Sequence, residues 1–301
     1  MSRDGILVVG GGFLGRALAE RLAASGHRVG VLSPRAEESA WPDGIAATSG
    51  RQEDRARVQR LLEAHGTVIH AAWGTTPGSS AGRPAVEAEA GLLPFLAFLD
   101  ALQDFPDARL LFLSSGGTVY GDPARLPVAE EAPLQPRSCH GAGKAAAELF
   151  LRIRAPARTV VLRPSNIYGP AQALKSGFGV IPHLLRCAAT GSPFRMWGDG
   201  SQVRDYLFVD DFCAAVLALA AQERVSGTFN LGSGAGTSLN DLCALVGAVT
   251  GRRLAVERLP AREADVGRIV LDIAALSRAV AWRPSLSLEA GLRRCWDRLR
   301  E

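Results

Sequence analysis

The sequence lacks the features that would place the chain in a membrane, in an oxidising compartment or on a nucleic acid. Its apolar runs stay well below the ~20 residues that cross a bilayer, and its first residues lead straight into a strand-like run, which predicts no signal peptide. The five cysteines are widely spaced and form no CxxC pair, which predicts free thiols, a cytoplasmic location and no metal site. The basic residues are scattered and the net charge is only +4, which predicts no nucleic-acid partner.

Lysine is almost absent from the chain. Of 34 basic residues only Lys144 and Lys175 are lysines. An ammonium group can change its pKa, whereas a guanidinium does not do so readily. A lysine kept in an arginine-rich chain is therefore a candidate for chemistry, and chance survival is the alternative.

Short apolar runs alternate with helical patterns over residues 1–165. The expected strands are 6–9, 29–32, 68–72, 110–114 and 160–162, and the expected helices between them are 13–24, 53–64, 85–103 and 143–154. Fully apolar strands in this rhythm predict an α/β fold, a doubly wound parallel sheet of the Rossmann type with helices on both faces.

The pattern changes after Pro164, where glycine, proline and loop segments become more frequent. Helical patterns near 180–189, 210–222, 239–250 and 286–299 indicate a smaller C-terminal α/β lobe, and 228–231 is expected to return to the main sheet as a strand. We therefore expect one domain over 1–165 plus about 205–232, and a second over 166–204 and 233–301.

A glycine-rich turn follows the first strand and fits G-x-G-x-x-G as Gly10, Gly12 and Gly15, with Phe13 and Leu14 between the last two. Gly10 allows the tight turn, Gly12 lets the backbone approach a pyrophosphate, and Gly15 lets the helix pack closely on the strand. The N-terminus of the following helix then faces the phosphates. In this strand–turn–helix context the motif predicts a dinucleotide site, and a glycine turn without a ligand is the alternative.

The second strand ends without the acidic residue that usually binds the ribose of NAD. It ends with Ser33 and Arg35, which are the candidate cofactor contacts there. Arg35 leaves room for the 2′-phosphate of NADP, and an ordinary solvated loop charge is the alternative.

Landmarks over nearly the whole length resemble the extended short-chain dehydrogenase/reductase family, and within it the nucleotide-sugar epimerases and dehydratases, of which the UDP-galactose 4-epimerases are familiar members. The landmarks are GGGFLG at 10–15, VIHAA at 68–72, SSGGTVYG at 114–121, GAGKAAAE at 141–148, RPSNIYGP at 163–170, GDGSQVRDYLFVDD at 198–211, TFNLGSGAGTSLNDL at 228–242 and AWRP at 281–284. The resemblance implies that the first domain holds NAD, or NADP, with Ala71, Ala72, Lys144 and Pro164 among its contacts. It implies that the second domain holds a UDP- or dTDP-linked sugar.

The family's catalytic centre is altered in this sequence. The resemblance implies hydride removal from a sugar carbon, with a Tyr–Lys pair and a nearby Ser or Thr acting on the hydroxyl proton. Lys144 matches the lysine, but His140 stands where the tyrosine is expected and Gly116 where the hydroxyl residue is expected. Ser115 and Thr118 are the hydroxyl residues that remain in this loop, and both are candidate catalytic residues.

Two interpretations follow from these departures, which include Gly91 where an asparagine is usual. In the first, His140 is the acid–base group, because imidazole has a pKa near 6.5 and the charge of Lys144 would lower it further. In the second, the catalytic site has been lost, and the protein binds its ligands without turnover. Cys139 as a nucleophile is a weaker alternative, since no second base is evident.

The resemblance also implies contacts to the nucleotide sugar. They are Asn166, Val180, Arg195, Trp197, Arg204, Arg262 and Asp265. Arg204 matches an arginine that binds the diphosphate, which a planar guanidinium can do through paired hydrogen bonds. The alternatives are a surface ion pair with Asp205 for Arg204, a core position for Trp197 and a turn cap for Asn166.

The sequence thus favours an NAD(P)-dependent nucleotide-sugar epimerase that regenerates its own cofactor. A 4-ketoreductase that consumes NAD(P)H and a catalytically inactive binding homologue are the alternatives, and dehydration is disfavoured because Gly117–Thr118 replaces the usual acid–base pair. Apolar residues on more than one face of helix 85–103, together with the helix from Ala142 to Arg154, predict a homodimer. Burial of that helix within the monomer is the alternative.

Overall fold

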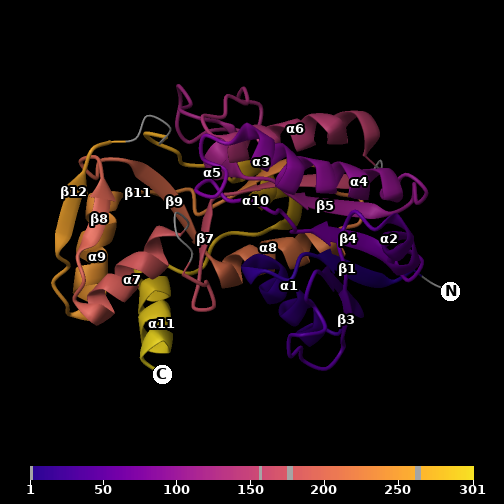
Figure 1. The fold of residues 1–301 in the computed structure, drawn as a ribbon, viewed down its shortest axis with the longest axis horizontal. Coiled ribbons are helices and arrows are strands. Elements are labelled where there is room, and N and C mark those ends of the chain that lie inside the picture. Colours follow the sequence, from indigo (N-terminus) through magenta and orange to yellow (C-terminus); the bar gives the residue numbers. More distant parts are fainter. Residues whose placement is uncertain (1–2, 156–157, 175–178, 262–265) are drawn as a thin grey trace.

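The computed structural model describes residues 3–155, 158–174, 179–261 and 266–301. The elements in chain order are β1 (Gly5–Val9), α1 (Phe13–Ala24), β2 (Val29–Ser33), β3 (Ile45–Ser49), α2 (Arg55–Leu62), β4 (His65–His70), α3 (Pro84–Glu87), the π-helical turn η1 (Ala88–Leu92), α4 (Leu93–Leu102), β5 (Arg109–Leu113), α5 (Gly116–Val119), α6 (Cys139–Arg154), β6 (Thr159–Pro164), β7 (Asn166–Tyr168), α7 (Val180–Thr190), β8 (Phe194–Trp197), β9 (Val203–Phe208), α8 (Val209–Ala221), β10 (Gly227–Leu231), β11 (Gly236–Ser238), α9 (Leu239–Thr250), β12 (Val256–Leu259), α10 (Ala274–Val280) and α11 (Leu288–Arg300). Figure 1 shows their arrangement.

A seven-stranded parallel sheet forms the larger part of the structure. Its strand order is β10-β6-β5-β4-β1-β2-β3, and each neighbouring pair is parallel. The predicted doubly wound Rossmann-type sheet is therefore confirmed, and 228–231 returns to it as part of β10. The order of the strands reverses between β1 and β4. In such sheets the carboxyl ends of the strands at the reversal form the crevice that binds ligands.

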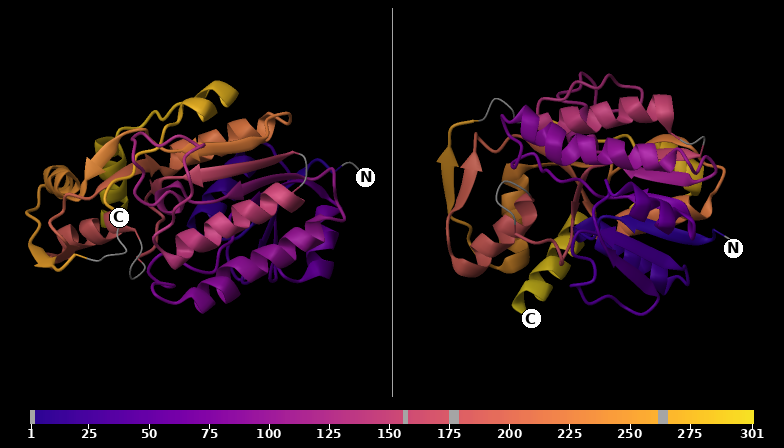
Figure 2. Two further views of the ribbon diagram at one scale, coloured as in Figure 1. Left: turned by 90° about the horizontal axis from the view of Figure 1, so that it is seen from above. Right: turned by 45° about the vertical axis from the view of Figure 1, so that its right-hand side comes forward.

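Helices cover both faces of this sheet, with α4 and α6 on one face and α1 and α8 on the other (Figures 1 and 2). Alternate residues of β1 supply the two cores, because successive side chains of a strand point to opposite faces. Leu7 and Val9 pack in one cluster with Phe95, whereas Val8 packs in the other with Leu18. The near-continuous apolar strands follow from this two-sided burial.

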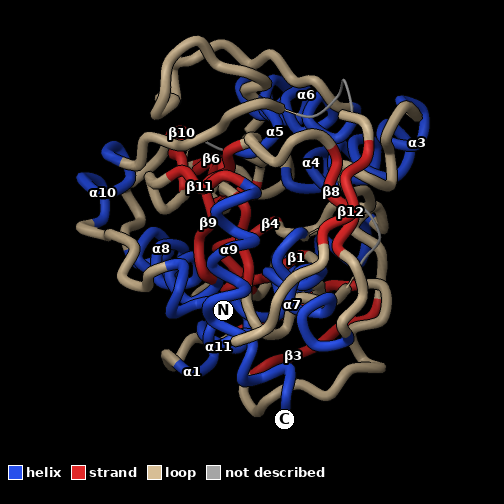
Figure 3. The backbone as a smooth tube through the Cα atoms, turned by 90° about the vertical axis from the view of Figure 1, so that its left-hand side faces the viewer, coloured by secondary structure: helices blue, strands red, loops and turns tan. Residues whose placement is uncertain are grey.

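Two small sheets, β11-β9-β7 and β12-β8, lie beside the large one. Figure 3 shows them together with α7 and α9. The boundaries of the two expected domains remain a prediction. Neither β3 nor α10 was expected from the sequence. In the case of β3 the reason is that the strand is only half-buried and its residues, Ile45–Ser49, are weakly apolar. No helix within the described ranges is long and apolar enough to span a membrane.

Candidate active site

The glycine-rich turn lies at the carboxyl end of β1, where the strand order reverses. Gly10 has a φ of +109°, and a Cβ on Gly15 would lie 1.8 Å from the Gly10 carbonyl oxygen, so both positions require glycine. A Cβ on Gly12 would meet no described atom within 4 Å, which leaves space in front of the first residues of α1, Phe13 and Leu14. The turn is tight where the backbone must bend and open where a pyrophosphate would approach the helix N-terminus.

The loop after β4 lies against this turn. The Ala71 N–H donates to the Val9 carbonyl at 2.8 Å, and a Cβ on Gly10 would lie 2.7 Å from the Ala72 nitrogen. The structure therefore brings these two predicted cofactor contacts to the glycine turn. Pro164 ends β6 at the same sheet edge, where it is buried beside β10.

The end of β2 lies on the other side of the turn. A Cβ on Gly11 would lie 3.0 Å from the Ser33 hydroxyl, so Ser33 is in contact with the turn. Arg35 is exposed two residues later. Its contact with a 2′-phosphate remains a prediction.

His140 and Lys144 lie in the first turns of α6. This helix is capped by Ser138, whose hydroxyl accepts a hydrogen bond from the Gly141 N–H at 3.1 Å. Residues four apart lie on the same face of a helix, and both side chains are buried there. The predicted pair is thus one buried unit.

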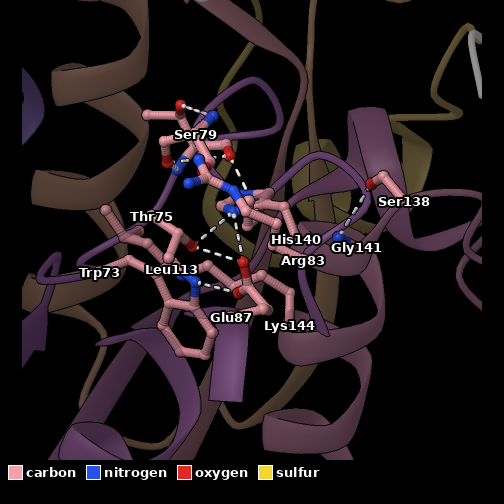
Figure 4. A network of polar contacts seen from close by, with 12 residues as sticks. Trp73, Thr75, Ser79, Arg83, Glu87, Leu113, Ser138, His140, Gly141 and Lys144 are labelled. Carbon is pink, nitrogen blue, oxygen red and sulfur yellow. Dashed lines mark hydrogen bonds and ion pairs between the residues drawn. The ribbon is translucent and has the colours of Figure 1, made fainter. Parts of the chain in front are cut away.

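Lys144 is held in an apolar place. Its ammonium donates to the Leu113 carbonyl at 2.7 Å and lies 3.9 Å from the centroid of the Trp73 ring (Figure 4). Burial lowers the pKa of Lys144 to about 7, although the carboxylates of Glu87 and Glu148 act in the opposite direction. The lysine therefore changes charge near neutral pH.

A buried carboxylate, which the sequence analysis did not identify, lies beside this pair. Glu87 accepts hydrogen bonds from the Trp73 indole at 2.8 Å and from the Thr75 hydroxyl at 2.6 Å. Two glycines make room for it. A Cβ would lie 2.8 Å from the Glu87 Oε1 if built on Gly91 and 2.5 Å from it if built on Gly143. The absence of the usual asparagine at Gly91 was the sequence signal for this rearrangement.

Glu87 is ionised in this setting. Burial by itself raises the pKa of the Glu87 carboxyl. Hydrogen bonds from Ser80, Thr75 and Trp73 outweigh the burial, so the pKa lies below its ordinary value. The group is therefore a carboxylate that only accepts hydrogen bonds at neutral pH.

His140 completes the cluster (Figure 4). Its Nδ1 lies 3.3 Å from the Thr75 hydroxyl and 4.0 Å from the Glu87 Oε2. Burial, followed by the charge of Lys144, lowers the pKa of His140 to about 4, and Glu87 opposes this change. The imidazole is therefore neutral at pH 7, and Lys144 acts on its pKa in the direction expected from the sequence.

The loop before the cluster explains the missing hydroxyl residue. A Cβ on Gly116 would lie 2.7 Å from the Arg163 carbonyl oxygen, so no larger residue fits there in this packing. Ser115 is half-buried at the start of α5. The Thr118 hydroxyl is buried and has no hydrogen-bond partner in the described part of the chain. Thr118 adjoins the first turn of α6, because a Cβ on Gly141 would lie 2.6 Å from its carbonyl oxygen. Neither hydroxyl has a hydrogen-bond partner among the described residues, and that of Thr118 is the more deeply buried.

Several expected contacts to the nucleotide sugar lie on the smaller sheets and on α7. The Asn166 amide on β7 donates to the Asp205 carbonyl at 3.0 Å, and Val180 is half-buried at the start of α7. Arg195 is exposed on β8, 3.7 Å from Glu257. Trp197 is half-buried at the end of β8. These positions come from three different elements of the second half of the chain.

Arg204 and Asp205 have separate surroundings on β9. The Arg204 guanidinium donates to the Val203 carbonyl at 2.9 Å, whereas Asp205 is fully buried and accepts hydrogen bonds from the backbone and hydroxyl of Ser233 at 2.7 Å. Asp205 thus fixes the segment after β10. Arg262 and Asp265 lie outside the described residues.

Comparisons with known proteins agree with this geometry. Residues 6–232 match the NAD dependent epimerase/dehydratase family. The chain is 29% identical over 292 residues to a UDP-glucose 4-epimerase of Mycolicibacterium smegmatis, with 93% of each chain covered. It is similar to a crystal structure of UDP-glucose 4-epimerase with UDP-glucose from Thermotoga maritima, with a TM-score of 0.90, 29% identity and 98% of both chains covered.

A Thermus thermophilus UDP-glucose 4-epimerase in complex with NAD matches with a TM-score of 0.89 and 31% identity, again over 98% of both chains. The family match covers most of the chain. The chain belongs to the NAD dependent epimerase/dehydratase family.

Proposed function

We propose that this chain interconverts epimers of a UDP- or dTDP-linked sugar with bound NAD, and that His140 takes the proton from the sugar hydroxyl. The observation that carries the proposal is the buried pair of His140 and Lys144 on one face of α6. The neutral imidazole of His140 stands in place of the usual tyrosine, and the usual lysine is present as Lys144 with a pKa of about 7. The imidazole is neutral at pH 7 and can accept a proton, and the lysine changes charge near neutral pH.

The residues present fit NAD. The open backbone at Gly12 and the N-terminus of α1 would hold the pyrophosphate, with Ser33, Ala71 and Ala72 on either side of the turn. NAD, when bound, supplies the hydride acceptor and donor. The Lys144 ammonium gives one hydrogen bond to the Leu113 carbonyl and retains donors for a ribose.

The chain's own residues supply the proton chemistry. His140 is neutral and can accept the hydroxyl proton, and it returns the proton when the sugar carbon is reduced again. The imidazolium formed in between is opposed by Lys144 and stabilised by the Glu87 carboxylate, whose Oε2 lies 4.0 Å from Nδ1. Ser115 and Thr118, whose hydroxyl is buried without a described partner, remain the candidates to bind the sugar hydroxyl.

The test is turnover of purified protein with UDP-glucose, UDP-galactose, their N-acetyl forms and dTDP-glucose, without added cofactor. We expect either member of an epimer pair to reach the same equilibrium mixture, and His140→Ala to lower kcat by about 10²–10⁴-fold. Full turnover by His140→Ala would refute the role of His140. Net NAD(P)H consumption would assign a reductase, and binding without turnover would assign an inactive homologue.

We also propose that the chain forms a homodimer through α4 and α6, which lie side by side on the outer face of the large sheet (Figures 1 and 2). Large apolar side chains are exposed on these helices. They are Leu93, Leu149, Phe150 and Ile153. Exposed apolar side chains grouped in this way favour a partner surface, and a second copy of the same face is complementary to it in character.

A further inference from the structure

We propose that Glu87 and Thr75 are positioning residues that hold His140 with its proton on Nδ1, so that Nε2 is the atom that takes the substrate proton. This inference rests on the proposed role of His140. It adds two residues to the reaction that neither the sequence motifs nor the family resemblance assigned.

The chain of hydrogen bonds from Glu87 through Thr75 to His140 fixes where each proton lies. Glu87 as a carboxylate has none to give. The Thr75 hydroxyl has one proton and donates it to Glu87, since this distance is 2.6 Å and the distance to His140 is 3.3 Å. The Thr75 oxygen can then only accept from His140 Nδ1. The histidine proton is therefore on Nδ1, and the lone pair is on Nε2.

A positive charge forms on the imidazole when Nε2 takes a proton. Among the described residues, the charged groups that act on His140 are Lys144 from its own helix and Glu87 from α3. Lys144 disfavours the imidazolium, whereas Glu87 favours it. Because the imidazole is buried, solvent contributes little to stabilising its positive charge, and the Glu87 carboxylate is the group that can do this. Glu87 thus supports both the tautomer and the charged intermediate state of the base.

Two glycines and a π turn provide the space that the Glu87 carboxylate occupies. Glu87 ends α3, and the π-helical turn η1 follows directly and carries Gly91. A Cβ on Gly91 would collide with both the Trp73 indole nitrogen, at 2.7 Å, and the Glu87 Oε1. Gly143 on α6 gives the carboxylate its space on the other side. Single π turns occur often at functional sites, and this one opens the helix beside the candidate base.

Four variants test the proposal by their rates. Glu87→Gln and Thr75→Val are expected to lower kcat by about 10- to 100-fold, less than the loss of His140 itself. Thr75→Ser keeps the hydroxyl and is expected to restore most of the rate. Glu89→Gln is the matched control, because it removes an exposed carboxylate two residues away and leaves kcat unchanged.

The pH profile separates positioning from a structural role. Glu87→Gln removes the carboxylate that raises the His140 pKa, so the acidic limb of kcat is expected to move to lower pH. Thr75→Val keeps that charge and is expected to leave the limb within about half a pH unit. If Glu87→Gln lowers kcat but the acidic limb does not move, Glu87 does not act on the His140 pKa and that part of the proposal is wrong. Circular dichroism identifies a variant that fails to fold.

A measurement without substrate tests the tautomer. The chain has five histidines, so ¹⁵N-histidine spectra contain five side-chain patterns, and His140→Ala identifies the one to follow. We expect a protonated Nδ1 on His140 in the native protein and a mixture of tautomers in Thr75→Val. A protonated Nε2 in an active protein would overturn the inference. A protonated Nδ1 in a protein without turnover would instead contradict the proposed function and leave the positioning intact.

Discussion

Removal of the Lys144 charge is expected to change how the stability of the protein depends on pH. Burial lowers the pKa of Lys144 from 10.5 to about 7, which corresponds to about 5 kcal/mol of free energy as an upper bound. Above pH 7 the folded protein releases this proton, whereas the unfolded chain keeps it up to about pH 10.5. The unfolded state then binds more protons, so the free energy of unfolding rises with pH in this window.

The comparison of the native protein with Lys144→Met isolates this effect. Methionine has a similar length and no charge, and the other titrating groups are shared by the two proteins. We expect the stability of the native protein relative to Lys144→Met to increase by up to about 5 kcal/mol between pH 7 and 10.5. Urea unfolding of cofactor-free protein at a series of pH values measures it.

The scarcity of lysine makes a direct measurement practical. Protein labelled with ¹³C at the lysine Cε gives two side-chain signals, from Lys144 and Lys175, and Lys144→Met removes one of them. The signal that disappears is expected to titrate near pH 7 in the native protein. A signal that titrates near the ordinary value of about 10.4, with a flat stability difference, would refute the reasoning.

Two further substitutions test the packing of the site and the proposed dimer. Gly143→Ala places a Cβ 2.5 Å from the Glu87 Oε1 and is expected to destabilise the protein by about 1–3 kcal/mol and to lower kcat. The control is Gly247→Ala in α9, whose Cβ makes only ordinary contacts, and it is expected to be neutral or stabilising. Thermal unfolding measures both variants. Equal effects of the two changes would argue against a steric role of Gly143. Ile153→Asp charges a side chain that is 76% exposed on α6 and is expected to convert a dimer into a monomer in light scattering, whereas Leu299→Asp, in the exposed last turn of α11, is not. A native monomer would reject the dimer.

The fold was predictable where local patterns repeat. The alternation of apolar strands with helical spacing determined the parallel sheet, and Gly10, Gly12 and Gly15 placed its ligand edge. The prediction missed β3, because Ile45–Ser49 is half-buried and contains small and polar residues that carry little apolar periodicity. The sequence also could not show that helix 85–103 contains a π turn, since the apolar spacing continues through η1, which contacts α6 only in the folded structure.

The candidate site was predictable where it lies on one helix and not where it joins several. The spacing of His140 and Lys144 on α6 was enough to expect a pair. Glu87, Trp73 and Thr75 come from α3 and from the loop after β4, and only the fold brings them to that pair. A glutamate and a threonine outside any motif cannot be recognised as site residues from one sequence. The sequence feature that pointed to them was the loss of a usual residue, because Gly91 stands where an asparagine is expected.

The cluster as a whole favours a rebuilt site over a lost one. A buried lysine or carboxylate is costly unless it is paired, so a site that had merely lost its tyrosine would gain stability by losing these charges as well. Here Lys144 is kept beside the Trp73 ring, and a second charged group, Glu87, is buried with three hydrogen-bond donors. The glycines and the π turn leave space for the Glu87 carboxylate. His140 is linked to this carboxylate through the hydroxyl of Thr75. The glycines, the π turn and the Glu87 carboxylate are arranged around a neutral imidazole, which is what we expect if His140 acts as a base. The position of the His140 proton in Thr75→Val, on Nδ1 or on Nε2, is the most direct test of this interpretation.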